Sequence, residues 1–344
     1  MHLPDGYLSP ETTIPAFVFM LGVWYLAFRK IQFAHNQQLI PRIALCAAFS
    51  FLVMMFNIPV VGGSSAHAVG AVLVAILVGP WAAILALSTT LLIQAFIFGD
   101  GGILALGINC LNMAVIMPCI GYVIYRLISG RALLGSRRNL VAVFVASYVG
   151  INLAAIAAGI EMGIQPLLFK TSSGIPLYGF YSISVALPAM VFTHGVFAGP
   201  LDGIVSSLAM GYIVKFAPQL LDNQQFVIDR KPAKTSWLAQ NMKLISFFAV
   251  VIILTPLGLL ASGTAYGEWA PDEVKQILGY IPQGMAGSTS WWHGVMPDYS
   301  WPKLGSNLFS HSLAYILSAL VGVVMISVLI ILSAKVTQKM AVKR

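Results

Sequence analysis

Nine runs of apolar residues limit what this chain can fold into. A helix needs roughly 20 mostly apolar residues to cross a bilayer core about 30 Å thick. The composition agrees with such crossings, because 58% of the 344 residues are hydrophobic and only 9% are charged, whereas soluble domains carry about 25% charged residues. We therefore predict an all-α integral membrane protein whose helices span residues 12–29, 42–60, 64–78, 81–98, 104–127, 140–160, 181–214, 243–262 and 309–334.

The distribution of charge predicts the orientation of these spans. With nine spans and an outside N-terminus, 16 of the 19 Lys and Arg residues fall on one side, and only Lys170, Lys275 and Lys303 fall on the other. Merging 64–98 into one helix broken at Gly79-Pro80 would scatter the basic residues over both faces. Because basic residues favour the cytoplasmic side, we predict a multi-pass protein of the cell (inner) membrane with its C-terminus in the cytoplasm. The net charge of +8 then reflects orientation and contact with the lipid bilayer, and no nucleic-acid partner is expected.

A polar stretch divides the chain into two units. Residues 216–242 carry prolines and a basic run between two apolar spans, which is typical of a cytoplasmic linker. We predict a metal-binding membrane domain at 1–215, and a C-terminal unit at 243–344. The two spans of that unit enclose an outside loop, 263–308, that is rich in Gly, Trp and Pro.

The first ten residues, Met1-His2-Leu3-Pro4-Asp5-Gly6-Tyr7-Leu8-Ser9-Pro10, precede the first span and contain no Lys or Arg. A secretory signal begins with a basic region, so we expect these residues to belong to the mature protein. The bulk of His2 should also protect Met1 from removal. The free α-amine, the deprotonated amide of His2 and its imidazole can then form two fused chelate rings in one plane. Such planar nitrogen donors suit Ni(II), Cu(II) or low-spin Co(II).

The planar chelate leaves one position for another ligand, and His67 is the candidate that we favour. His67 is predicted at the outer end of the third span, on the same side as His2, and an ionisable residue in an apolar run indicates a functional site. The alternative is a structural histidine bonded to a neighbouring carbonyl or to Ser64. His311 opens the ninth span on the same side but belongs to the C-terminal unit. His194, with Asp202 two turns further along the helix, is compatible with a proton relay, a transport gate or a helix contact.

Several motifs carry a resemblance to a known family. They are the opening ten residues, Gly62-Gly63-Ser64-Ser65-Ala66-His67, and Phe98-Gly99-Asp100-Gly101-Gly102-Ile103-Leu104-Ala105-Leu106-Gly107-Ile108-Asn109. Over residues 1–215 the chain resembles the CbiM/NikM substrate-binding (S) components of cobalt and nickel energy-coupling-factor (ECF) transporters. The C-terminal unit, with Thr255-Pro256-Leu257-Gly258-Leu259-Leu260-Ala261 and Gly267-Glu268-Trp269, resembles the PDGLE-type CbiN/NikN accessory subunit, fused here to the first.

The resemblance implies a fold, a site and partners. The fold would be a seven-helix core, in which an N-terminal helix is added to six, followed by two further transmembrane helices. Met1 and His2 would supply three nitrogens to the transported Co²⁺ or Ni²⁺, and His67 the fourth. The partners would be a membrane coupling (T) subunit and two cytoplasmic ATPase subunits. The acid expected soon after His194 is displaced to Asp202, so that pair receives no role from the resemblance.

The sequence argues against an enzyme. It lacks Gly-x-x-x-x-Gly-Lys-[Ser/Thr], so we expect no ATP hydrolysis by this chain and no cofactor. An intramembrane metalloenzyme would need a motif such as His-Glu-x-x-His, which is absent. A channel would need rings of charged or carbonyl ligands, and His194 and Asp202 are the only conspicuous buried charges. The sequence does not decide between cobalt and nickel, although the opening residues Leu3 to Pro10 favour cobalt.

Overall fold

The computed structural model describes residues 1–31, 39–61, 63–221, 237–261, 263–288, 292–305 and 307–342. Its first half contains α1 (Pro10–Ile31), α2 (Leu39–Met54), β1 (Ile58–Val60), β2 (Ser64–Ala66), α3 (Ala71–Val78), α4 (Pro80–Ile93), η1 (Gln94–Phe98), α5 (Leu106–Cys110), η2 (Leu111–Ile116) and α6 (Met117–Ser129). There follow α7 (Arg137–Gly163), α8 (Gln165–Leu168), α9 (Ile183–Thr193), η3 (His194–Ala198), α10 (Gly199–Phe216) and η4 (Pro218–Leu221). The C-terminal part contains α11 (Trp237–Leu254), η5 (Thr255–Leu260), α12 (Pro271–Leu278), α13 (Gln283–Ser288), η6 (Pro297–Tyr299), η7 (Pro302–Leu304) and α14 (Leu308–Val342).

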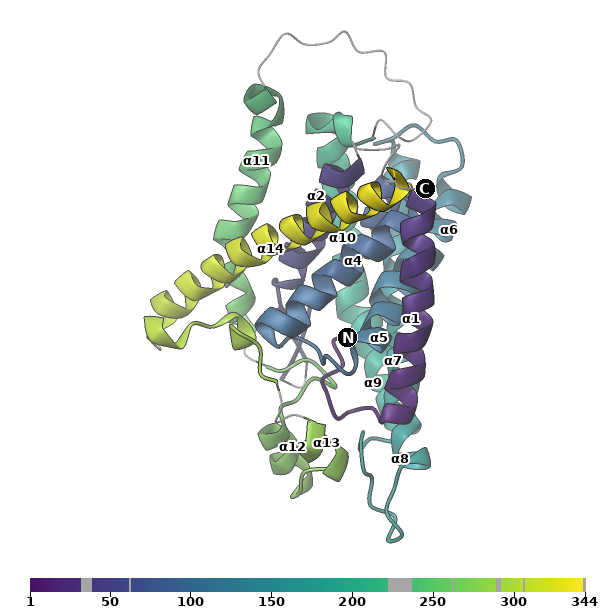
Figure 1. Ribbon diagram of the computed structural model, residues 1–344, viewed down its shortest axis with the longest axis vertical. Coiled ribbons are helices and arrows are strands. Elements are labelled where there is room, and N and C mark those ends of the chain that lie inside the picture. The colour runs from purple at the N-terminus through teal and green to yellow at the C-terminus, as the bar shows by residue number, and fades with distance from the viewer. Residues whose placement is uncertain are drawn as a thin grey trace.

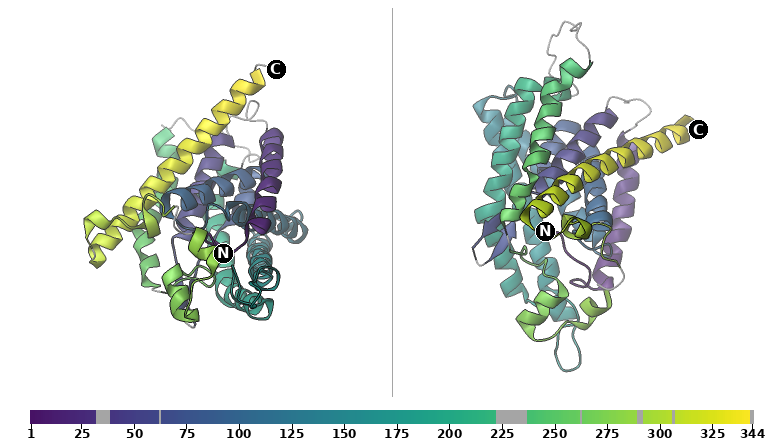
Figure 2. Two further views of the ribbon diagram at one scale, coloured as in Figure 1. Left: turned by 60° about the horizontal axis from the view of Figure 1, so that its bottom comes forward. Right: turned by 90° about the vertical axis from the view of Figure 1, so that its left-hand side faces the viewer.

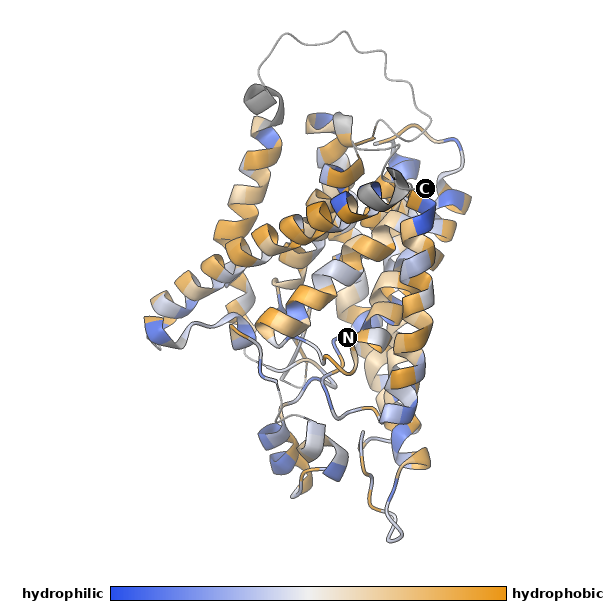
Figure 3. Cartoon of the chain, viewed as in Figure 1, coloured by the Kyte–Doolittle hydropathy of each residue, from blue (hydrophilic) through white to orange (hydrophobic). Residues whose placement is uncertain are grey.

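The helices form a bundle in which most long helices run roughly side by side (Figures 1 and 2). Within the described residues, seven helical segments are long and apolar enough to cross a membrane: Pro10–Ile31, Pro80–Phe98, Leu106–Ser129, Arg137–Leu168, Ile183–Phe216, Met242–Leu260 and Leu308–Gln338. Most residues in these segments are hydrophobic (Figure 3), as a lipid environment requires. The protein is therefore an all-α, multi-pass membrane protein. The orientation of its termini stays a prediction.

Two of the nine predicted spans correspond to shorter helices. α2 has 16 residues and α3 has only eight. A left-handed glycine, Gly79 (φ 83°), separates α3 from α4, and Pro80 then occupies the first turn of α4, where its missing N–H leaves no helical hydrogen bond unmade. The number of membrane crossings therefore stays a prediction for these two segments.

The predicted helix over 64–78 is wrong in its first half. Residues 64–66 form β2, which pairs antiparallel with β1 so that Ile58 faces Ala66. The turn between them uses Gly63 (φ 77°), and Gly70 (φ 71°) precedes α3; this left-handed conformation is open to glycine at little steric cost. His67 therefore lies in an extended segment between a hairpin and a buried helix.

The C-terminal unit packs on the first unit. α14 lies obliquely across one face of the bundle (Figures 1 and 2) and packs against α2 and α4. The contact is close, because a side chain at Gly322 would overlap the ring of Phe51. Tyr315 donates a hydrogen bond to the carbonyl oxygen of Met55 at 3.3 Å. The predicted linker, 216–242, lies mostly outside the described residues, since positions 222–236 are not among them, and the predicted domain boundaries remain predictions.

Candidate metal centre

The N-terminal segment is buried inside the bundle. Met1, His2 and Leu3 are 5%, 1% and 1% exposed. The side-chain amide of Asn109, on α5, accepts a hydrogen bond from the N–H of Leu3 at 2.9 Å and donates one to its carbonyl oxygen at 3.1 Å. The N–H of Gly102 donates a second hydrogen bond to that oxygen at 2.9 Å. These bonds satisfy the buried peptide groups of Leu3 and fix the two residues before it.

Asp5 joins the N-terminal segment to the glycine-rich loop before α5. Its carboxylate accepts hydrogen bonds from the N–H groups of Ile103, Leu104 and Ala105 at 3.2, 2.9 and 3.2 Å. A Cβ at Gly102 would overlap this carboxylate, so a larger residue would separate the two segments. The opening motif and the 98–109 motif are therefore two halves of one interface.

Asp202 fixes the backbone that carries His67. One oxygen of its buried carboxylate, on α10, accepts hydrogen bonds from the N–H groups of Val69 and Gly70, both at 2.7 Å. These two donors precede α3, so the carboxylate also lies near the positive end of the helix dipole. Asp202 and His194 were considered together from the sequence, but they bond to different partners, because Nδ1 of His194 lies 2.8 Å from the carbonyl oxygen of Met190.

The rings of His2 and His67 face each other. Their centroids lie 5.2 Å apart and their planes differ by 30°. Nδ1 of His67 lies 3.0 Å from the carbonyl oxygen of Ala68, which favours a hydrogen on Nδ1 and leaves Nε2 to accept. Burial is the main cause that lowers the pKa of His67 below its ordinary value, so the ring is neutral, as a metal ligand must be.

His2 is the unusual member of this pair. Within the described residues, neither of its ring nitrogens has a hydrogen-bond partner, although the residue is almost fully buried. Nδ1 lies 3.4 Å from an oxygen of Asp100, which is outside hydrogen-bonding geometry. Buried polar atoms are nearly always paired. An unpaired imidazole at this position therefore indicates a ligand site.

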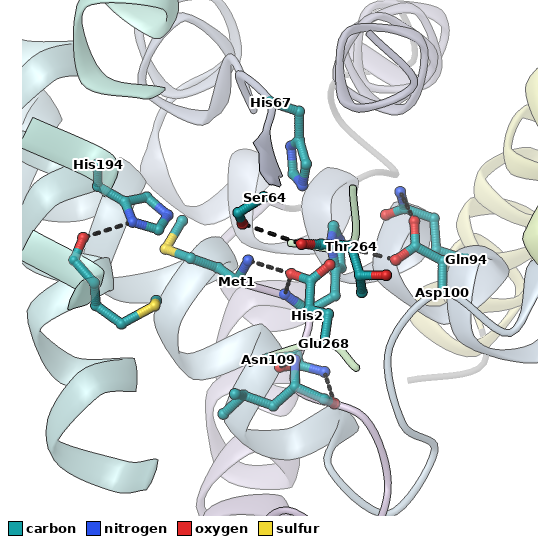
Figure 4. A network of polar contacts seen from close by, with 12 residues as sticks. Met1, His2, Ser64, His67, Gln94, Asp100, Asn109, His194, Thr264 and Glu268 are labelled. Atoms are coloured by element: carbon teal, nitrogen blue, oxygen red, sulfur yellow. Dashed lines mark hydrogen bonds and ion pairs between the residues drawn. The ribbon is translucent and has the colours of Figure 1, made fainter. Parts of the chain in front are cut away.

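Glu268 completes the cluster, and the sequence did not predict it. Its Oε1 accepts hydrogen bonds from the Met1 ammonium at 2.6 Å and from the His2 N–H at 2.9 Å (Figure 4). Burial acts to raise the pKa of Glu268, but the adjacent Met1 ammonium makes the largest opposing contribution, and this pKa is lowered to about 2. The only signal was the Gly267-Glu268-Trp269 motif, to which no function was assigned.

The structure thus brings Met1, His2 and His67 together, as predicted, and adds a carboxylate from the C-terminal unit. One donor atom from each of His2, His67 and Glu268 can be chosen so that all lie within 4.8 Å of one another. The role of Met1, His2 and His67 as metal ligands stays a prediction. His311 is exposed on α14 and is absent from this cluster. His194 lines a small cavity shared with Met1 and His67.

A cavity of about 910 Å³ leads to the cluster. His2, His67 and Glu268 line it together with Asp100 and Asp298. Asp100 is held by a hydrogen bond of 2.5 Å from Tyr299 and one of 3.3 Å from the Gln94 amide. Both units therefore build the wall of the cavity, which has room for a hydrated cation.

Replacing Asp202 by alanine should weaken metal binding without removing a donor. The N–H groups of Val69 and Gly70 would lose their acceptor, at a cost of about 1 to 3 kcal/mol each, and His67 would lose its fixed position. We expect an affinity for Ni²⁺ lower by about 10- to 100-fold, as for other groups that orient a metal ligand. Calorimetric titration measures this loss.

The control is Ser206→Ala, because Ser206 is buried one turn further along α10 and its hydroxyl has no partner. It should bind metal normally. Asp202→Asn keeps an acceptor oxygen, so its affinity for Ni²⁺ should lie between those of the Asp202→Ala and Ser206→Ala proteins. An Asp202→Ala protein that is less stable but binds Ni²⁺ with unchanged affinity would limit Asp202 to a structural role.

Comparisons with known proteins agree with this architecture. Residues 2–220 match the family described as "Cobalt uptake substrate-specific transmembrane region" (CbiM), and residues 240–339 match the PDGLE domain. The chain is 42% identical to the fused nickel transport protein NikMN of Rhodobacter capsulatus, over 97% of both chains. It is 41% identical to the probable fused nickel transport protein LarMN of Lactiplantibacillus plantarum, over 96% of both.

A cobalt transport protein and a solved structure match part of the chain. The cobalt transport protein CbiM of Salmonella typhimurium is 32% identical over 54% of this chain and 76% of its own length. A crystal structure of a truncated transition metal transporter is 46% identical, with a TM-score of 0.58, and covers 62% of this chain and 99% of its own. The chain therefore belongs to the CbiM family and carries a PDGLE domain after its CbiM region.

Proposed function

We propose that this protein is the substrate-specific component of an ATP-driven importer that captures Ni²⁺ or Co²⁺ from outside the cell. The Met1 amine, the His2 amide nitrogen and the His2 imidazole would bind the ion in one plane, and the His67 imidazole would complete it. The observation that carries this proposal is the buried, unpartnered imidazole of His2 beside the amine and His67.

The chemistry of these donors suits the proposal. Consecutive nitrogens of one chain form fused chelate rings, and deprotonation of a peptide nitrogen gives a strong donor that favours planar Ni(II) or Co(II). Asn109 and Asp5 hold the first residues in place before the ion arrives. Little conformational entropy is then lost on binding, which favours affinity.

The proposed transport step needs partners. The chain contains no phosphate-binding motif, so the energy would come from two cytoplasmic ATPase subunits through a membrane coupling subunit, as in ECF transporters. A metal channel or an intramembrane metalloprotein is a weaker proposal, because the sequence contains no His-Glu-x-x-His motif and the proposed four-nitrogen plane would leave no open position on the ion for a substrate.

Nickel is the favoured substrate within this proposal. The two fused relatives named as nickel transport proteins align with nearly the whole chain, including the PDGLE domain. The relative named as a cobalt transport protein aligns with about half of it. The comparisons therefore favour nickel, whereas the opening residues alone favour cobalt.

The metal content of the purified protein tests the proposal. Cells that express the chain with its partners are grown in equal Ni²⁺ and Co²⁺, and mass spectrometry gives the metal per chain. We expect about one ion per chain, mostly nickel, and none in the His67→Ala control. Cobalt in excess would reverse the choice of metal, and equal metal in both proteins would contradict the site.

A further inference from the structure

Glu268 occupies the side of the N-terminus on which the planar chelate must form. Its Oε1 accepts hydrogen bonds from the amine of Met1 and from the N–H of His2. These two nitrogens must each lose a hydrogen before they bind a metal ion. Both nitrogens are therefore engaged as donors to Glu268 in the metal-free protein, and a metal ion that arrives meets other donors first.

Those other donors are already in place. The two imidazoles and the Glu268 carboxylate form a group of three side chains whose donor atoms lie within 4.8 Å of one another. Among the described residues, neither ring nitrogen of His2 has a hydrogen-bond partner, although Nδ1 lies 3.4 Å from an oxygen of Asp100, and Nε2 of His67 is free of the hydrogen bond to Ala68. Two imidazoles and one carboxylate are a common ligand set for divalent metal ions, and they bind without deprotonation of a peptide nitrogen.

We propose that His2, His67 and Glu268 form a capture site for a hydrated divalent cation, which binds there before it enters the planar chelate. This inference rests on the proposed function. The cation first exchanges water for the two imidazoles and the carboxylate in the open cavity. The amine and the peptide nitrogen then lose one proton each to solvent water and displace the carboxylate, so two protons leave for each ion that enters the plane.

The C-terminal unit holds Glu268 in position for this step. The hydroxyl of Ser64, on β2, donates to the carbonyl oxygen of Thr264 at 3.0 Å, and the hydroxyl of Tyr7 donates to that of Trp269 at 2.9 Å. Figure 4 shows Thr264 and Glu268 between the N-terminus and the Asp100 side of the cavity. The PDGLE domain thus contributes a ligand as well as packing contacts.

The variant Glu268→Gln tests the capture site in the full-length chain. Glutamine keeps an oxygen that accepts from Met1 and His2, but it lacks the charge and the donor strength of a carboxylate. Zn²⁺ and Ni²⁺ are the two probes. Zn²⁺ prefers tetrahedral sites and leaves peptide N–H groups intact, so it reports on the capture site alone, whereas Ni²⁺ reports on the planar chelate.

We expect Glu268→Gln to lower the affinity for Zn²⁺ by about 100-fold, because loss of a group that only supports a ligand already costs roughly 10- to 100-fold. The association rate of Ni²⁺, followed by stopped-flow absorption of the planar complex, should fall about tenfold, because the ion loses one of the three donors that it meets first. The equilibrium affinity for Ni²⁺ should change much less, because Glu268 is not a ligand in the final plane. The control, Asp272→Asn, removes a charge from the same cavity and should change neither measurement.

Two results would overturn the inference. Faster association of Ni²⁺ with the Glu268→Gln protein would mean that the carboxylate only blocks the site. Unchanged Zn²⁺ affinity would mean that it is not a ligand. Failure of the proposed function has a different signature, since His67→Ala would then retain full Ni²⁺ affinity whatever the result at Glu268.

Discussion

The His67→Ala protein should bind Ni²⁺ at least about a thousandfold more weakly than the native protein, which corresponds to about 4 kcal/mol. In the proposed site the N-terminal chelate would supply three nitrogens, and the fourth position of the plane would be left to water. The fold should persist, because within the described residues the His67 ring has a single hydrogen bond, to the adjacent residue. Competition with a chelator of known affinity measures the loss, and thermal unfolding of the metal-free protein checks the fold.

His311→Ala is the matched control for this prediction. His311 is exposed at the start of α14, away from the cluster, and its removal should leave the affinity for Ni²⁺ unchanged. If His311→Ala lowered the affinity for Ni²⁺ and His67→Ala left it unchanged, His67 would not be the ligand.

Keeping the formyl group on Met1 should abolish metal uptake although His2 and His67 are intact. The formyl group turns the amine donor into an amide, and it must fit where the native amine is buried against Glu268. Uptake of radioactive ⁶³Ni by cells that contain the partner subunits measures the loss, and calorimetric titration of the purified protein measures binding directly.

The control is the same protein after treatment with a deformylase, which frees the amine of Met1. Deformylation should restore binding, which shows that the formyl group did not damage the fold. Native affinity in the formylated protein would exclude the amine as a ligand and would favour a site made only of side chains.

The same chelate makes binding depend on pH. The amine and the peptide nitrogen release two protons when they bind the ion, so protons compete with the metal. The affinity for Ni²⁺ should therefore fall as the pH is lowered below neutrality, by up to about 100-fold per pH unit while both protons are released. The formylated protein, which lacks the amine donor, should show a shallower dependence.

The apolar runs predicted most helices, because an apolar segment that is buried in lipid has few alternatives to a helix. The prediction failed between residues 64 and 70 for a reason that no local pattern shows. Ala68 to Leu73 are apolar enough for a helix, but the carboxylate of Asp202, more than 130 positions later, holds the N–H groups of Val69 and Gly70. Gly70 was the only local signal of a different backbone.

The candidate site was predictable in part. Met1, His2 and His67 could be named because the chelate depends on their chemistry and because the motifs resemble a known family. Glu268 could not, since its position depends on how a loop of the C-terminal unit packs against Ser64 and Tyr7. Glu268 stands in no sequence motif with the spacing of metal ligands, so its proximity to Met1 and His2 becomes visible only when the two units are placed together.

The contact between Met1 and Glu268 also sets an order of assembly during synthesis. The two residues lie 267 positions apart, and a ribosome that adds about 5 to 20 residues per second needs roughly 15 to 50 seconds to pass from one to the other. In that interval the nascent protein holds the amine and both imidazoles but lacks the carboxylate. A truncated translation product that ends before Glu268 would therefore retain every nitrogen donor and still load its ion slowly.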